Sequence, residues 1–112
     1  MTVLNIEFEV GDDNVFADLG FAPAEAEALS HKAELVGMLY RCQEQRGLNQ
    51  SAFSRLVGIP QPRLSQLYGG KLAGVSTDKL LSAVAKVGAH VVIRVEQNPK
   101  TSLAGRVELE FA

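Results

Sequence analysis

The chain has 112 residues, which suffices for one domain with flanking arms but not for two independent cores. Apolar residues make up 46% and charged residues 21%, a globular balance that excludes a disordered chain. The longest apolar runs, such as 91–93, fall far short of the roughly 20 residues that cross a bilayer, and the first residues lack a secretory signal. We therefore expect a cytoplasmic protein with no membrane contact.

Few residues suited to metal binding or catalysis occur in the chain. Cys42 is the one cysteine, so it cannot form an internal disulfide, and the two histidines, His31 and His90, lie far apart in the sequence. A zinc site would have to use mainly carboxylates, so we expect no metal and no cofactor. A glycine-rich phosphate loop, paired catalytic carboxylates and a nucleophile-base motif are all missing, and we expect no enzyme.

Charge is distributed unevenly, although the net charge is only −2. Residues 1–30 carry seven acids and neither lysine nor arginine, whereas residues 31–71 have a net charge of +4. A basic centre suits a polyanion such as nucleic acid, and an acidic arm suits a basic protein partner. Solvated surfaces without a partner would explain the same charges equally well.

The first part of the chain predicts a strand followed by a long helix. Apolar and polar residues alternate over 4–10, as in a strand with one buried face, and we assign 1–28 to an acidic N-terminal strand and arm. Pro23 suits the first turn of a helix that Gly47 ends, with a break expected near Ser30. The predicted inward stripe of that helix consists of Ala33, Val36, Leu39 and Tyr40.

Three shorter helices follow, and their ends are marked by capping residues. Asn49 predicts the start of a helix over 50–57, which Gly58 ends, and the next helix covers 61–68. Ser76 predicts the start of a further helix over 77–87. We assign 29–88 to one helical domain. The predicted inward residues of the three helices are Ala52, Phe53, Leu56, Val57, Leu64, Leu67, Leu80, Leu81, Val84 and Val87.

The C-terminal region 89–112 predicts two strands, over 90–96 and 106–111, with a turn at 98–100. Short strands at both termini cannot bury their apolar faces and protect every edge within one small domain. We therefore expect a mainly α fold with short terminal strands forming a small sheet, and a homodimer that uses 89–112 for dimerisation.

Helices 50–57 and 61–68 are joined by a turn too tight for an antiparallel hairpin, which predicts a helix-turn-helix. The second helix of such a pair can enter the major groove of DNA, where glutamine bonds adenine and arginine bonds guanine. The candidate base-reading residues are Gln61, Pro62, Arg63 and Gln66. The candidate phosphate contacts are Gln50, Ser65, Lys71, Arg41 and Arg46.

The stretch 49–71 resembles the Cro/cI or XRE class of helix-turn-helix proteins. It has glutamine at the start of the first short helix, glycine before the turn, Gln61 near the start of the recognition helix, and Gly70-Lys71 after it. The resemblance covers about 30–88 and implies binding to a palindromic operator in double-stranded DNA. Phe53-Ser54 and Lys79 depart from the usual pattern of the class.

Two segments, 15–21 and 61–65, are similar to a subgroup that includes HigA-type antitoxins. That resemblance implies a protein that binds a RelE/HigB-like ribonuclease toxin and represses the operon they share. The acids of the N-terminal arm, Glu7, Glu9, Asp12 and Asp13, would then neutralise a basic toxin. Two alternatives stay open: a stand-alone XRE regulator of phage or chromosomal origin, and an interaction module whose helix pair never meets DNA.

Overall fold

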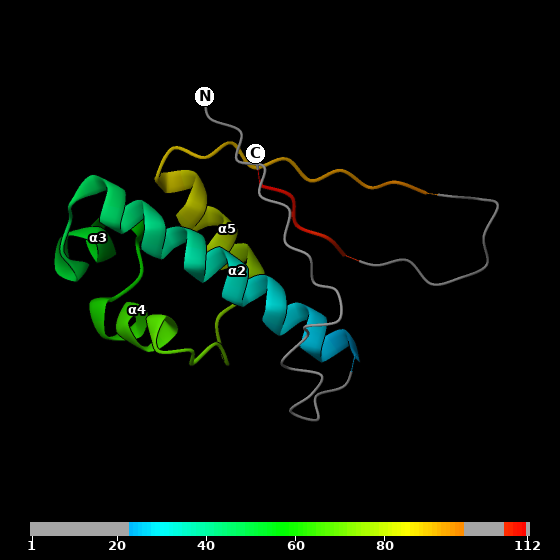
Figure 1. The fold of residues 1–112 in the computed structure, drawn as a ribbon, viewed down its shortest axis with the longest axis horizontal. Coiled ribbons are helices and arrows are strands. Elements are labelled where there is room, and N and C mark those ends of the chain that lie inside the picture. The colour runs from blue at the N-terminus through cyan, green and yellow to red at the C-terminus, as the bar shows by residue number, and fades with distance from the viewer. Residues whose placement is uncertain (1–22, 98–106, 112) are drawn as a thin grey trace.

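The computed structural model describes residues 23–97 and 107–111, so the predicted strand over 4–10 lies outside the described residues. Within them the chain forms four helices: α2 (Pro23–Arg46), α3 (Gln50–Val57), α4 (Gln61–Tyr68) and α5 (Thr77–Lys86). The long α2 packs mainly against α5, and α3 packs against α4 and α5 near the C-terminal end of α2 (Figure 1). None of these helices combines the length and apolar character needed to cross a membrane.

Helix α2 is continuous through Ser30, so the predicted break there is wrong. The helix begins at Pro23, inside the segment assigned to the N-terminal arm, and its one proline stands at this first position, where the missing N–H costs no intrahelical bond. Its inward stripe also differs from the prediction, since Ala33 and Tyr40 are exposed. The buried apolar residues of α2 are Ala26, Leu35, Val36, Met38 and Leu39.

The three short helices have nearly the predicted bounds, because local capping groups set them. The Asn49 side chain accepts a hydrogen bond from the Ala52 N–H at 2.8 Å, and the Ser76 hydroxyl accepts one from the Lys79 N–H at 3.0 Å. Gly58 ends α3 with a φ of 72°, a conformation that a side chain would strain. Only the end of α5 differs, by one residue, at Lys86.

One core joins all four helices. Phe53, Leu39, Leu64 and Leu80 are all fully buried. The unusual Phe53 therefore serves as a central core residue that closes α3 onto its neighbours. The predicted inward residues Ala52, Leu56 and Leu81 are only half-buried, because they lie at the margin of that core.

Cys42 and the two histidines occupy different environments. Cys42 is half-buried on α2 and packs against the core, and burial raises the pKa of its thiol, which favours the unreactive protonated form. His31 is buried on the same helix, whereas His90 is exposed. The geometry thus agrees with a packing role for Cys42 rather than redox sensing.

The two C-terminal strands are absent from the described residues, so the prediction of strands over 90–96 and 106–111 is wrong for residues 90–96 and 107–111, whereas residue 106 lies outside the described residues. Only Ala89 and Glu110 occupy isolated bridge positions. The segment 107–111 instead docks on the helices: the Val107 N–H donates to Glu27 Oε1 at 2.6 Å, and Phe111 is buried in the core. Residues 107–111 therefore contact α2 and the core, and within the described residues they form no ladder along 90–96.

Glu34 on α2 is the side chain with the least favourable polar environment in the described region. Its Oε2 atom is buried and has no hydrogen-bond partner there. Burial disfavours the carboxylate and raises the pKa of Glu34 from 4.5 to about 7. At neutral pH the folded state therefore includes a partly desolvated, uncompensated acid.

The substitution Glu34→Gln is expected to stabilise the protein at alkaline pH. Between pH 4.5 and 7 the folded state retains a proton that the unfolded state releases, so the free energy of unfolding falls as the pH rises through this window. After allowance for partial solvent screening, the gain from Glu34→Gln above pH 7 is about 1–2 kcal/mol, and it vanishes below pH 4.5. Urea unfolding between pH 4 and 8 measures it.

The exposed acid Glu25 on the same helix provides the control. Glu25→Gln removes the same charge and should leave the slope of stability between pH 5 and 7 as in the wild type. An unchanged slope in Glu34→Gln would mean that Glu34 is solvated and titrates normally.

Candidate nucleic-acid interface

The α3-α4 connection is a tight turn closed by backbone hydrogen bonds. The N–H groups of Gly58 and Ile59 both donate to the Ser54 carbonyl, at 2.9 and 3.2 Å. Ile59 is buried, so the turn is also held from inside, and Pro60 leads directly into α4. This turn sets α4 at a steep angle to α3, as the sequence predicts for a helix-turn-helix (Figure 1).

Helix α4 has a buried face and an exposed face. Leu64 is 0% exposed and Leu67 is 1% exposed, as predicted. Four of the polar-side candidates, Gln61, Pro62, Ser65 and Gln66, are exposed. The face that carries the side-chain amides is thus available to a partner. It carries no acidic residue that would repel DNA phosphates.

The first residues of α3 and α4 are joined through their side chains. Gln61 Nε2 donates to Gln50 Oε1 at 2.8 Å. This contact places the predicted phosphate-binding residue beside the predicted base-reading residue and orients both amides. This pairing was not predicted from the sequence. The signal that could have indicated it is that each of the two helices begins with a glutamine and that only a short turn separates them.

Arg63 has a second role that the sequence did not indicate. Its Nη2 donates to the Ala73 carbonyl at 2.6 Å, and its Nη1 donates to the Lys71 carbonyl at 3.3 Å and to Gln66 Oε1 at 3.2 Å. Arg63, which is half-buried as a whole residue, therefore holds the loop that follows α4 through its guanidinium. Base reading by Arg63 stays a prediction. A charge reversal at this position would disturb the loop as well as any DNA contact.

The remaining phosphate candidates lie in different places. Ser65 is exposed on α4, and Lys71 is exposed just after it, with its backbone N–H bonded to the Gln66 carbonyl at 2.9 Å. Arg41 is exposed on α2. Arg46 Nη2 donates to the Val87 carbonyl at 2.8 Å, so Arg46 also ties the end of α2 to the end of α5.

The C-terminal end of α4 is positioned by Tyr68, which sequence reasoning overlooked. Its hydroxyl donates to Gln43 Oε1 on α2 at 2.7 Å, and its ring meets that of Tyr40 edge to face, with centroids 5.2 Å apart. Burial raises the pKa of Tyr68 to about 12. This polar and aromatic contact orients α4 on α2. Tyr40 packs on the Tyr68 ring at the surface and is therefore not part of the core.

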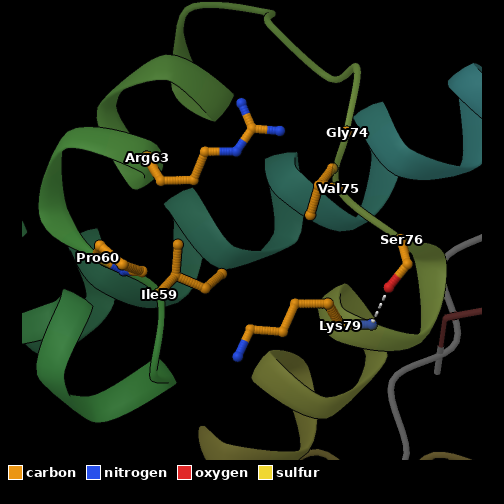
Figure 2. A pocket seen from close by; sticks show the side chains of 7 residues that line it. All are labelled: Ile59, Pro60, Arg63, Gly74, Val75, Ser76 and Lys79. Carbon is orange, nitrogen blue, oxygen red and sulfur yellow. Dashed lines mark hydrogen bonds between the residues drawn. The ribbon is translucent and has the colours of Figure 1, made fainter.

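A pocket of about 300 Å³ lies between the start of α4 and the start of α5 (Figure 2). Arg63 and Lys79 supply its two cationic side chains, whereas the Ser76 hydroxyl is engaged in capping α5. Lys79 thus adds a basic group near α4. It was not among the DNA-contacting residues predicted from the sequence. Across the described ranges, histidine, cysteine, aspartate and glutamate do not gather in a group that could hold a metal ion.

Comparison with known proteins agrees with this geometry. A solved chain described as an XRE family transcriptional regulator is 28% identical, with a TM-score of 0.67 over 76% of this chain and 96% of that chain. No curated protein matches the sequence. A family model described as a helix-turn-helix domain matches residues 15–96. Because that match spans most of the chain and includes α3, the turn and α4, the protein belongs to the helix-turn-helix domain family.

Proposed function

We propose that this chain is a sequence-specific DNA-binding transcriptional repressor and the antitoxin of a toxin-antitoxin pair. The observation that carries the DNA-binding part is the exposed amide face of α4, which Leu64 and Leu67 anchor from the opposite side. Membership of the helix-turn-helix family and the XRE neighbour support a DNA-binding transcriptional regulator. The proposal gives the chain no catalytic step and no cofactor, and places it in the cytoplasm.

In this proposal α4 enters the major groove, which is wide enough to admit a helix. Gln61 and Gln66 would bond base edges, since a glutamine amide matches the donor and acceptor of adenine. Gln50 and Lys71 would contact phosphates on either side. In a homodimer, two copies of α4 about 34 Å apart would read the two halves of a palindromic operator.

The antitoxin role is the finer part of the proposal. It is supported by the resemblance of 15–21 and 61–65 to HigA-type antitoxins, and the family match begins at Val15, so it includes the first of these segments. The acidic residues of 1–30 would suit a basic ribonuclease toxin. A stand-alone regulator is the second candidate, because the XRE neighbour is described as a transcriptional regulator alone.

Co-expression with the protein encoded beside it tests the antitoxin role. We expect a small basic partner that arrests growth when expressed alone, is harmless with this chain, and co-purifies with it. The DNA preceding the gene should be bound by the chain in a gel-shift assay, with affinity falling steeply as salt rises. DNA binding without any toxic neighbour would favour the stand-alone regulator.

A further inference from the structure

The segment 90–97 exposes an unusual run of apolar side chains. Val92, Ile93 and Val95 are 68, 77 and 89% exposed, although the four helices bury their own large aliphatic residues in one core. The segment runs as an extended chain away from α5, and within the described residues it forms no strand (Figure 1). A row of exposed β-branched residues on an unpaired extended chain is prone to pair with another strand.

The sequence of this segment is suited to pairing with itself. In an extended chain Val91, Ile93 and Val95 lie on one face, so this face is apolar and symmetric about Ile93. The opposite face holds His90, Val92, Arg94 and Glu96, and the Nε atom of Arg94 forms an ion pair with Oε1 of Glu96 at 3.2 Å. The opposite charges of Arg94 and Glu96 balance on this face, which leaves no net charge to separate two copies.

We propose that 90–96 pairs in antiparallel register with the same segment of a second copy, with Ile93 on the two-fold axis. Val91 then lies opposite the partner's Val95, so apolar residues face each other on both sides of the axis, and His90 lies opposite the partner's Glu96, which can accept a hydrogen bond from it. This inference deepens the homodimer that the proposed function requires and names its contact. The two paired segments form a smaller interface than the standard of about 800 Å² per partner, so the dimer dissociates on dilution.

The second copy suits this edge better than the chain's own C-terminal residues do. Phe111 is already buried among the helices, and the Val107 N–H is bonded to Glu27. Residues 107–111 are therefore engaged on α2 and the core, and within the described part of the chain they form no ladder with 90–96. A two-fold symmetric pair satisfies one edge of each copy with the same contact.

Disulfide trapping at Ile93 tests the register. In a Cys42→Ala background, Ile93→Cys places two thiols directly opposite each other, where Cα atoms 4.5–5.5 Å apart fall within the range that a disulfide bridges. Val92→Cys is the matched control, since Val92 is similarly exposed but is offset from its own copy by two positions, beyond about 7 Å. We expect a covalent dimer from Ile93→Cys under mild oxidation and at least tenfold less from Val92→Cys.

Sedimentation of Ile93→Lys provides the second measurement. Ile93 lies outside the helical core, so the far-ultraviolet circular dichroism should stay that of the wild type while the dimer is lost. Equal cross-linking at both positions, or a dimer that survives Ile93→Lys, would overturn the proposal, as would a wild-type monomer at high concentration. These outcomes are distinct from failure of the proposed function, which would appear as a wild-type dimer that binds no DNA.

Discussion

Replacing both Gln61 and Gln66 by alanine is expected to lower the affinity for the specific operator by about 30-fold or more. A well-placed pair of hydrogen bonds to a base is worth about 1–3 kcal/mol of discrimination, and both amides lie on the exposed face of α4. Fluorescence anisotropy with operator DNA measures the loss. Because both residues are exposed, the melting temperature should stay close to that of the wild type.

The same titrations contain an internal control. Glutamine carries no charge, so binding of the double variant to random DNA, and its dependence on salt, should match the wild type. Loss of specific binding with retained non-specific binding identifies base readers. Full operator affinity in the double variant would mean that Gln61 and Gln66 do not read bases, whereas a wild-type protein that binds no DNA would favour an interaction module.

The substitution Leu64→Ala is expected to lower the free energy of unfolding by about 2–5 kcal/mol. Leu64 is fully buried, so its truncation removes apolar contacts and leaves a cavity that the neighbouring helices fill only in part. Urea denaturation followed by circular dichroism measures the change. Small domains have only about 5–15 kcal/mol of stability, so Leu64→Ala should also reduce the amount of folded protein in cells.

The adjacent residue gives the matched control. Ser65 is exposed on the same turn of α4, and Ser65→Ala should change stability by less than about 0.5 kcal/mol. Equal effects of the two substitutions would mean that Leu64 does not anchor α4. The orientation of its amide face would then need another explanation.

Arg63 shows why a site predicted from sequence alone can change when the fold is known. Its position in the recognition helix favoured base reading. The structure shows the guanidinium bonded to two carbonyls of the following loop, at Lys71 and Ala73. Nothing in the residue types of α4 indicates that the loop returns to it. Gln61 and Gln66 bond only to other side chains and hold no backbone carbonyl of this loop through their side chains, so they are cleaner tests of DNA recognition than Arg63.

The terminal strands show a related failure. The segment 90–96 is extended but is not the predicted strand, because a strand also needs a partner with free backbone groups. Residues 107–111 are held in part by Phe111 in the core and by Glu27 on α2. The residue pattern of 90–96 does not show whether residues 107–111 will pair with that segment or pack against the helices.

The amino-acid sequence by itself determined the short helices and the turn between α3 and α4, because their signals act over a few residues. Asn49 and Gly58 mark the ends of α3, and Leu64 marks the buried side of α4. Only the tertiary structure decided that Tyr40 packs on Tyr68 and that Arg63 holds the loop after α4. These contacts depend on where separate segments meet in space, which capping residues and helical periodicity do not encode.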